Sequence, residues 1–283
     1  MTTANLQSTP LGFGLGIAAS DVNGDGWTDL YVSNDYIEED YLYINQKDGT
    51  FKDELKQQIG HISHFSMGSD IADFNNDALP DIFSLDMLPE DNHRQKLLYG
   101  PDTYEKYQYM LRNGFYHQIM RNMLQLNNGD GTFSEIGQLA GVSNTDWSWA
   151  PLLADFDNDG WKDLFVSNGY LRDYTNRDFV SYYADQRIKE QRGEKSDPLL
   201  DIIARMESTK TPNYIFRNNG DLTFTKKSAD WGFDELVLSN GAVHADLDLD
   251  GDLDLVINNV NAPARIYENQ VANGHYLKVN LMG

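Results

Sequence analysis

Four stretches of the chain repeat one order of small, acidic and apolar residues. In each stretch a run of small residues leads into an Asp-rich loop, and a five-residue apolar run follows the loop. A largely continuous apolar run is typical of a strand covered on both faces, and small residues suit an inner strand where sheets converge. The loops begin at Asp21, Asp73, Asp155 and Asp246, and the apolar runs occupy residues 30–34, 82–86, 164–168 and 255–259.

A second motif follows each apolar run and predicts a hairpin. An apolar strand leads into an Asn-Asp-Gly turn and then into Thr-Phe, and such a turn between apolar runs is a strong hairpin signal. The motif ends at Phe51, Phe133 and Phe224, whereas the fourth copy, from Ile266, has lost the regular turn. Each unit therefore predicts four antiparallel strands, A to D, with the Asp loop between A and B and the hairpin between C and D.

The spacing between the two motifs is constant on one side and variable on the other. From Asn45, Asn127 and Asn218 to the start of the next Asp loop the distance is 28 residues in every case. From the start of each Asp loop to the following Asn it is 24, 54, 63 and 23 residues. The variation therefore falls in the connection between strands B and C, where units two and three carry insertions at 86–121 and 168–212.

Repeated four-stranded units of this size are typical of β-propeller blades. We predict an all-β fold, a β-propeller of four-stranded blades, with partly helical insertions between strands B and C of blades two and three. A parallel α/β fold is a poor match, because the constant 28-residue link contains no amphipathic helix with start and stop signals. The blades are expected at about 11–55, 63–136, 145–227 and 238–282, and helical stretches at 102–112 and 178–192.

No strand is exchanged between the two ends of the chain in this scheme. The last strand of blade four is expected at 275–281, and the outer strand that should precede blade one is missing. Either four blades close by themselves, or the chain is a piece of a larger propeller with further blades upstream. We expect the larger propeller.

Charge separates the expected blades from the insertions. The 283 residues include 22 Lys+Arg and 44 Asp+Glu, giving a formal charge of −22, and no Cys. Such acidity disfavours binding to nucleic acid, and the absence of Cys excludes a disulfide scaffold or a thiolate metal site. We expect no transmembrane segment and no signal peptide, because no apolar run reaches about 18 residues and the N-terminal pattern is absent. The insertions hold 13 basic and 13 acidic residues, so the whole imbalance belongs to the blades.

The insertions are rich in tyrosine as well as neutral. They contain 9 of the 16 Tyr in 81 residues, and both leave the blades at the end opposite to the Asp loops. Such a face suits contact with carbohydrate or protein, because Tyr offers a large and rigid surface. The alternative is that these rings pack the insertions onto the propeller rim. They are Tyr99, Tyr104, Tyr107, Tyr109, Tyr116, Tyr170, Tyr174, Tyr182 and Tyr183.

The four Asp loops have the residue pattern of a cation site. In D-x-[DN]-x-D-G-x-x-D, positions 1, 3, 5 and 9 place side-chain oxygens around one point, position 7 adds a main-chain carbonyl, and Gly at position 6 permits the sharp turn. All-oxygen, carboxylate-rich sites favour Ca²⁺, and Mg²⁺ ranks second because it prefers a tighter octahedron with retained waters. The expected side-chain ligands are Asp21, Asn23, Asp25, Asp29, Asp73, Asn75, Asp77, Asp81, Asp155, Asp157, Asp159, Asp163, Asp246, Asp248, Asp250 and Asp254, with the carbonyls of Trp27, Leu79, Trp161 and Asp252.

These loops have two other interpretations. An EF-hand is excluded, because its twelfth position needs Glu and holds Val32, Ser84, Val166 or Ile257 within expected strands. Four solvated Asp/Gly turns without a metal remain the alternative. Loop two is the weakest site, because Ala78 replaces Gly and costs about 1 kcal/mol if its φ is positive.

On these residues the chain resembles the VCBS/FG-GAP repeat propellers, and in detail the ASPIC/UnbV (cartilage acidic protein-like) branch of Bacteroidetes surface and secreted proteins. The likeness rests on the four D-x-[DN]-x-D-x-x-x-D loops, the three N-x-x-D-x-T-F hairpins and the segment 148–169. The final residues, 273–283, resemble the opening of the ASPIC/UnbV module. The resemblance implies calcium in the loops, a seven-bladed parent and, only loosely, a role in adhesion or ligand binding.

These observations predict a calcium-stabilised β-propeller, extracellular or on the cell surface, that acts as a binding or adhesion module for glycan or protein. Sites with a Kd of about 10⁻⁴ M need extracellular calcium to fill, which places the protein outside the cytoplasm. One alternative is a calcium-dependent polysaccharide lyase or hydrolase, and another is an architectural spacer without a ligand. The sequence shows no recognisable set of nucleophile, His and acid, so no catalytic residue and no organic cofactor is predicted.

Overall fold

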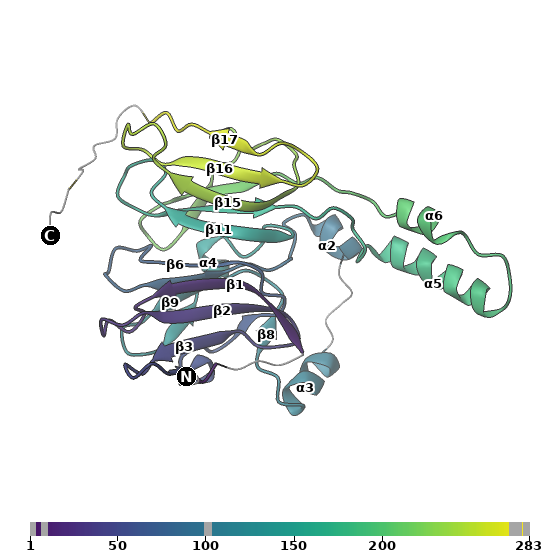
Figure 1. The fold of residues 1–283 in the computed structure, drawn as a ribbon, viewed down its shortest axis with the longest axis horizontal. Coiled ribbons are helices and arrows are strands. Elements are labelled where there is room, and N and C mark those ends of the chain that lie inside the picture. Colours follow the sequence, from purple (N-terminus) through teal and green to yellow (C-terminus); the bar gives the residue numbers. More distant parts are fainter. Residues whose placement is uncertain (1–3, 7–10, 99–103, 272–278, 280–283) are drawn as a thin grey trace.

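The computed structural model describes residues 4–6, 11–98, 104–271 and 279. The chain is mostly β, with four small antiparallel sheets that follow one another along the sequence (Figure 1). Sheet 1 is β1 (Gly12–Ser20), β2 (Asp29–Tyr36), β3 (Tyr41–Asn45) and β4 (Phe51–Asp53); sheet 2 is β6 (Ser69–Ala72), β7 (Asp81–Ser84), β9 (Met123–Asn127) and β10 (Phe133–Glu135). Sheet 3 is β11 (Ser148–Ala154), β12 (Asp163–Asn168), β13 (Tyr214–Asn218) and β14 (Phe224–Lys226); sheet 4 is β15 (Ser239–Ala245), β16 (Asp254–Asn259) and β17 (Arg265–Tyr267).

Each sheet is built from sequential antiparallel strands, as the repeats predict. The register of sheet 3 is representative, with Ala154 opposite Asp163 in β11–β12 and Asn218 opposite Phe224 in β13–β14. The last strand predicted for the fourth unit, 275–281, lies outside the described residues except at 279.

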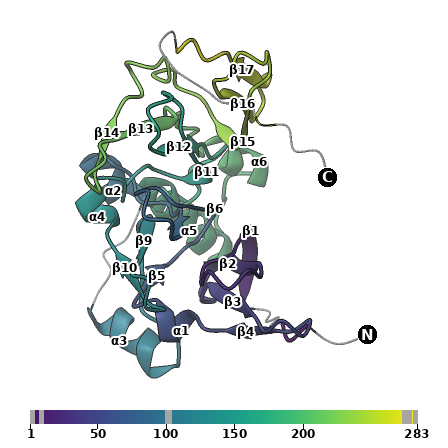
Figure 2. The same ribbon diagram turned by 90° about the vertical axis from the view of Figure 1, so that its left-hand side faces the viewer.

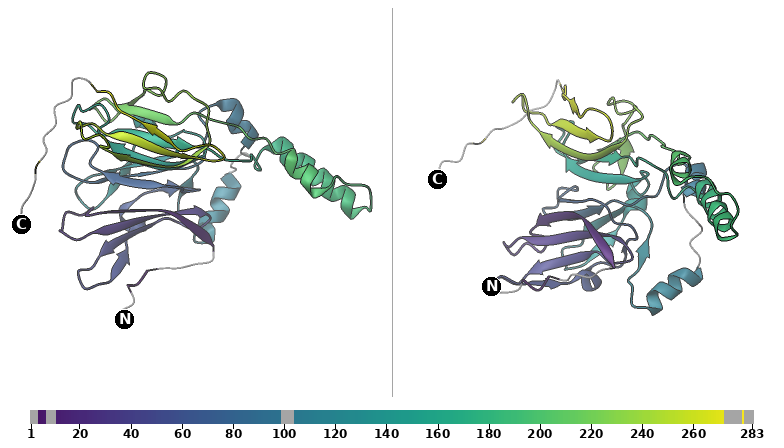
Figure 3. Two further views of the ribbon diagram at one scale, coloured as in Figure 1. Left: turned by 45° about the horizontal axis from the view of Figure 1, so that its top comes forward. Right: turned by 45° about the vertical axis from the view of Figure 1, so that its right-hand side comes forward.

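The four sheets form an open arc, with sheet 1 at one end and sheet 4 at the other (Figures 2 and 3). Their first strands, β1, β6, β11 and β15, lie next to one another in that order along the inner side. The described residues close no barrel. At the two ends of the arc apolar side chains are open to solvent: Phe13 and Ile17 in sheet 1 are 63% and 66% exposed, and Val243 in sheet 4 is 57% exposed.

The apolar cores lie between successive sheets. Tyr31 and Ile82 belong to the core between sheets 1 and 2, Phe83 and Leu164 to the core between sheets 2 and 3, and Phe165 to the core between sheets 3 and 4. Successive side chains of a strand point to opposite faces, so the neighbours Ile82 and Phe83 enter different cores. This alternation explains why the second strand of each unit is apolar throughout rather than at every other position.

The long connections of sheets 2 and 3 carry most of the helical residues. The β7–β9 connection contains α2 (Asn92–Leu98), α3 (Tyr104–Arg112) and β8 (Gln118–Ile119), and β8 pairs in parallel with β5 (Ile62–Ser63). The β12–β13 connection contains α5 (Arg177–Gln191) and α6 (Leu199–Ala204), and the four-residue helices α1 (Leu55–Gln58) and α4 (Gly137–Ala140) follow the hairpins of sheets 1 and 2.

These connections gather at one end of the sheets (Figure 1). Asn176 is the N-cap of α5, and its side-chain oxygen accepts hydrogen bonds from the N–H groups of Asp178 and Phe179. None of the helices in the described part of the chain has the length and apolarity needed to cross a membrane.

Candidate functional site

The four Asp loops lie at the end of the sheets opposite to helices α2, α3, α5 and α6 (Figure 1). We call them loop 1 (21–29), loop 2 (73–81), loop 3 (155–163) and loop 4 (246–254), with positions 1 to 9 in each. In loops 1–3 the carboxylate at position 1 accepts hydrogen bonds from the N–H groups at positions 5 and 6, at 2.7–3.1 Å. The carboxylate of the first Asp therefore holds each of these loops in a closed turn through its bonds to positions 5 and 6.

The backbone at position 6 needs a left-handed conformation in all four loops. Its φ lies between 68° and 97°, with glycine in three loops and Ala78 in loop 2. A Cβ in this region costs about 1 kcal/mol, so loop 2 carries local strain that the other loops lack. The positive φ on which the expected weakness of loop 2 depends is present, and its weaker metal binding stays a prediction.

Position 9 is a buried anchor in every loop. Asp29, Asp81, Asp163 and Asp254 are nearly inaccessible, and in each the two carboxylate oxygens accept main-chain N–H groups. For Asp81 these donors are Phe74, at 3.3 Å, and Asn127 at the end of β9, at 2.8 Å. The same pair of bonds recurs in loops 1, 3 and 4. Position 9 therefore ties each Asp loop to the last residue of the third strand or, in loop 4, to Asn269, two residues after β17.

Burial of these anchors is electrostatically costly. Burial is the main cause that raises the pKa of Asp81 and of Asp163 to about 7. The charges of nearby acids in the same loop contribute to this rise, and hydrogen bonds from main-chain N–H groups oppose it. Each carboxylate oxygen has a second lone pair beyond the one used by an N–H group, so a divalent cation still has an oxygen to bind. A cation at this position would offset the cost of the buried charge.

Loops 3 and 4 bring three carboxylates together. One oxygen each from Asp155, Asp157 and Asp159 lies within 4.8 Å of the others, and Asp246, Asp248 and Asp250 form the equivalent group. In loops 1 and 2 position 3 is Asn, and its amide donates to the carboxylate at position 5, from Asn23 to Asp25 at 3.2 Å and from Asn75 to Asp77 at 2.9 Å.

Basic side chains pair with carboxylates in two of the loops. Arg217, on β13, lies against loop 3 with Nε 2.6 Å from Asp157 Oδ2 and a terminal nitrogen 2.7 Å from Asp159 Oδ2. Lys47 lies 3.2 Å from Asp25 in loop 1. A metal entering either loop must compete with these cations.

Loop 4 has the donor set that best fits a hard divalent ion. Desolvation and the charge of Asp250 both raise the pKa of Asp248 and of Asp252, and no ion pair to loop 4 occurs within the described ranges. Asp252 is 4% exposed, and its Oδ1 and the Oδ1 of Asp246 are buried without a hydrogen-bond partner. A bound calcium ion would neutralise the repulsion among these carboxylates and would bind the oxygens that have no hydrogen-bond partner.

Each predicted metal ligand therefore has a defined place, although its ligation stays a prediction. Position 7, expected to offer its carbonyl, donates its N–H to the carboxylate at position 5 in all four loops, at 2.9–3.2 Å. The repeat pattern could not indicate Arg217, because a basic residue precedes the hairpin Asn only in the third unit and so is not part of the repeat. The side chain of Asp252, expected to contribute only its main-chain oxygen, is outside the acidic group of loop 4, and its Oδ2 accepts the N–H of Val271 at 3.2 Å.

An Asn at the end of the third strand, or just after it, links sheets 2, 3 and 4 to the sheet before. The side-chain amide of Asn127 donates to the carbonyl of Val22 at 2.9 Å, and Asn218 donates to Phe74 at 2.8 Å. Asn269 donates in the same way to Phe156 at 2.7 Å. The repeat spacing had identified these Asn residues only as hairpin markers, yet they connect consecutive Asp loops.

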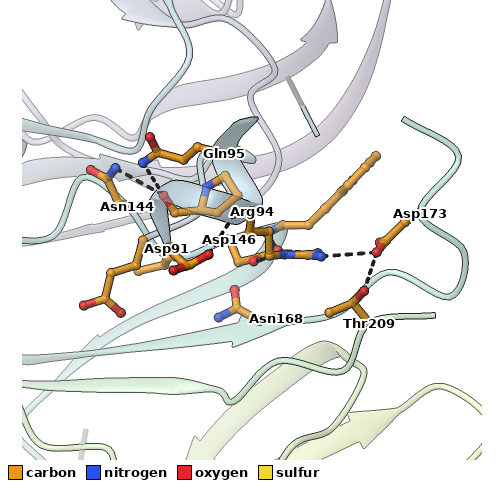
Figure 4. A network of polar contacts seen from close by, with 12 residues as sticks. Asp91, Arg94, Gln95, Asn144, Asp146, Asn168, Asp173 and Thr209 are labelled. Atoms are coloured by element: carbon orange, nitrogen blue, oxygen red, sulfur yellow. Dashed lines mark hydrogen bonds and ion pairs between the residues drawn. The ribbon is translucent and has the colours of Figure 1, made fainter. Parts of the chain in front are cut away.

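At the opposite end, one arginine joins the two long connections (Figure 4). Arg94, on α2, pairs with both carboxylate oxygens of Asp146, and a terminal nitrogen lies 3.2 Å from Asp173 Oδ2. Thr209 donates to the same oxygen of Asp173 at 2.5 Å. Asp146 and Asp173 are both buried, so this cation holds the β7–β9 and β12–β13 connections together as one surface.

The aromatic residues of this end divide into packed and exposed sets. The ring of Trp147 stacks on Tyr170 with centroids 4.0 Å apart, and Tyr182 donates to Asp197 and lies under Arg205. Tyr104 and Tyr109 on α3 are instead exposed. Some of the tyrosines named from the sequence are therefore packed, as the rim-packing alternative expects, and others are exposed. Tyr99 lies outside the described residues.

A family model described as FG-GAP-like repeat matches residues 21–84, 115–166 and 195–257, which together exceed half of the chain. Human cartilage acidic protein 1 is 34% identical over 101 residues, which make up 34% of this chain and 14% of that much longer relative. One solved structure, titled for the specific recognition of non-reducing terminal N-acetylglucosamine by an Agrocybe aegerita lectin, shares 16% identity. Its TM-score is only 0.20, over 92% of this chain and 81% of that one.

Proposed function

This chain belongs to the FG-GAP-like repeat family, and we propose that it is a calcium-stabilised extracellular β-propeller module that binds a glycan or protein. In this proposal sheets 1–4 are four blades of a larger propeller, and the ligand binds the surface formed by the β7–β9 and β12–β13 connections. The observation that carries it is the division of the molecule into two ends. Acidic loops occupy one end, and a surface joined by Arg94 occupies the other.

Calcium in the loops is supported by the donor chemistry. The residues are carboxylates and amides, and loop 4 combines clustered acids with buried oxygens that have no partner. Ca²⁺ bound there neutralises the repulsion among the carboxylates and fixes the loop conformation. With a Kd of about 10⁻⁴ M and about 1 mM Ca²⁺, each occupied site stabilises the fold by roughly 1.4 kcal/mol.

A labelled full-length chain on an array of glycans and extracellular proteins, in about 1 mM Ca²⁺, tests the binding role. We expect at least one class of ligand to bind, and Tyr104→Ala or Tyr174→Ala to weaken that binding, since both rings are exposed at the connection end. Trp27→Ala is the matched control, because Trp27 is an exposed aromatic at the Asp-loop end. If no glycan or protein on the array binds, the result favours the architectural spacer.

One contact favours the second candidate, a polysaccharide lyase or hydrolase. The hydroxyl of Tyr107 lies 2.5 Å from Nδ1 of His117 at the surface of the connection end, and such a pair can exchange a proton with a substrate. The Asp loops lie at the other end, so a calcium-bound substrate is not adjacent to this pair. Binding without new unsaturated or reducing sugar ends supports the binding module, and new ends that vanish in Tyr107→Phe support the enzyme.

A further inference from the structure

The three cores between the sheets are built from the same positions of the repeat. In each sheet a residue of the second strand, its partner on the third strand and the residue at position 2 of the Asp loop face the next sheet, and we call this the forward face. In sheets 1–3 every one of these side chains is at most 5% exposed. They are Tyr31, Leu42, Val22, Phe83, Leu124, Phe74, Phe165, Ile215 and Phe156.

Sheet 4 exposes its forward face. The equivalent residues are Val256, its partner Ile266 and Leu247 in loop 4. Ile266 is 69% exposed and Leu247 is 51% exposed. Val243, directly opposite Val256 on β15, extends this face and is also exposed. A face that is buried between sheets three times in this chain is thus open the fourth time.

Sheet 1 exposes the opposite, rear face, which each later sheet turns toward the sheet before it. The second-strand residues of the rear face in sheets 2, 3 and 4 are Ile82, Leu164 and Leu255, and each is at most 4% exposed. Leu30 has the same position in sheet 1 and is only partly buried, and Ile17 on β1 is 66% exposed. The strand β1 has no charged residue, although 23% of the chain is charged.

The chain therefore carries both halves of one more inter-sheet interface, at the two ends of an arc that is open on one side (Figure 2). We propose that a second copy of this chain closes the arc, with the forward face of sheet 4 in each copy packed on the rear face of sheet 1 in the other. The contact continues the type of interface that already joins sheets 1–4.

Two copies are the number that closes a ring of ordinary size. Two arcs of four sheets make eight blades, the upper end of the usual range of about four to eight, whereas three arcs would exceed that range. A pair of identical head-to-tail contacts then leaves neither apolar end open. This inference rests on the proposed function only in treating the sheets as blades of a larger propeller, and it assigns the remaining blades to a second chain.

Burial of apolar surface drives this contact, and charge opposes it. The exposed residues of both faces are apolar side chains whose equivalents are buried elsewhere in the repeat. Each copy has a formal charge of −22, so the two copies repel one another over a long range. Salt screens this repulsion, so we expect the association to strengthen as the salt concentration rises.

Sedimentation equilibrium of the full chain at tens of micromolar, in about 0.15 M salt and about 1 mM Ca²⁺, tests the proposal. We expect twice the mass of one chain, with no further growth as the concentration rises. A monomer overturns the proposal. A mass that keeps rising also overturns it, because head-to-tail contacts that do not close give open filaments.

A pair of opposite charges tests the two faces. Leu152 and Ala242 pack in the core between sheets 3 and 4, and Val243 and Ile17 have the equivalent positions on the two open faces. We expect Ile17→Asp and Val243→Lys each to weaken dimerisation about tenfold or more, because each substitution buries an unpaired charge. An equimolar mixture of the two variants should recover the dimer, since one contact is then unchanged and the other pairs opposite charges.

Val180→Asp is the control, because Val180 is exposed on α5, away from both faces. We expect it to keep the wild-type mass, and thermal unfolding should show that all three variants are folded. Equal dissociation by Val180→Asp, or a mixture of Ile17→Asp and Val243→Lys that stays monomeric, overturns the assignment of the two faces.

Two outcomes separate this inference from the proposed function. If the chain is a monomer and still binds a ligand on the array, the second copy is ruled out and the binding module stands. If the chain is a dimer whose two variants behave as expected and no ligand on the array binds, the shared ring stands and the binding role is wrong.

Discussion

The side-chain amide of Asn218 donates a hydrogen bond to the main-chain carbonyl of Phe74, which lies in the preceding sheet 144 residues earlier in the chain. The bond is buried and 2.8 Å long, and equivalent bonds join sheets 1 and 2 and sheets 3 and 4. Asn218 also donates to Lys162 in the loop of its own sheet, at 2.9 Å. In each of the second, third and fourth units, one Asn therefore bonds both to the Asp loop of its own sheet and to the Asp loop of the preceding sheet.

Replacing Asn218 by Ala should lower the free energy of unfolding by about 2 to 3 kcal/mol, because buried carbonyls lose their donor. Asn45→Ala is the matched comparison, since its amide bonds the loop carbonyl of Thr28 and its oxygen accepts a turn N–H, as in Asn218. Asn45 makes no bond to a preceding sheet within the described chain. Urea denaturation should therefore show a loss at least about 1 kcal/mol smaller for Asn45→Ala; equal losses would mean that the inter-sheet bond contributes nothing.

Arg217→Gln should raise the calcium affinity of loop 3 by about fivefold. The guanidinium of Arg217 forms two exposed ion pairs, with Asp157 and Asp159, and so competes with calcium for these carboxylates. Removing the two ion pairs removes a competing interaction of about 1 kcal/mol. Terbium luminescence excited through Trp161, in a Trp27→Phe background, reports on this loop. Lys226→Gln, which removes a surface charge paired with Glu90, is the control. Weaker ion binding by Arg217→Gln would show that the arginine supports the site.

Asp40 should make the fold less stable as pH rises. It is fully buried between Tyr31 and Ser66, at 2.6 and 2.7 Å, and burial raises its pKa from 3.8 to about 7. The folded state therefore retains a proton that the unfolded chain loses, so stability is complete below pH 4, falls as pH rises to about 7 and is then level. The difference corresponds to about 4 kcal/mol.

Asp40→Asn should remove this decline, because the amide keeps the shape without the charge. Free energies of unfolding measured from pH 4 to pH 8 should show a gap between variant and wild type that widens by several kcal/mol. Glu190→Gln, at an exposed ion pair on α5, is the control and should follow the wild-type profile. Parallel profiles for Asp40→Asn and the wild type would mean that Asp40 is ionised in the folded protein at low pH.

Arg94→Met should cost about 3 to 5 kcal/mol, because it leaves Asp146 and Asp173 buried without a cation. It should also release the β12–β13 connection, seen as faster proteolysis within residues 168–212. Arg187→Met, which removes an exposed pair with Glu190, should cost less than about 1 kcal/mol and leave proteolysis unchanged. Similar effects of both substitutions would contradict the joining role of Arg94.

The strands could be predicted because the information that sets them is local. The apolar runs at 30–34 and 164–168 lie in β2 and β12, and the Asn-Asp-Gly turns join β3 to β4 and β9 to β10. Helices α3 and α5 lie within the two ranges, 102–112 and 178–192, except that α5 begins one residue earlier. In each case the pattern and the element span a few neighbouring residues.

The contacts that form the candidate sites could not be predicted from local sequence patterns. Arg94 meets Asp173 across 79 residues and Arg217 meets Asp157 across 60, and no repeat or period records either pair. The parallel pairing of β5 with β8 likewise joins residues 62–63 to 118–119. Such contacts depend on how the sheets are arranged in space, which the local pattern does not contain.

Thermal unfolding of the chain in about 1 mM Ca²⁺ and in excess EGTA tests the calcium claim most directly. Each filled site should raise the unfolding temperature by about 3 to 6 °C, and Asp250→Asn in loop 4 should remove one site's share of that rise. Superimposable curves for the wild type in calcium and in EGTA would contradict a fold held by metal in its Asp loops.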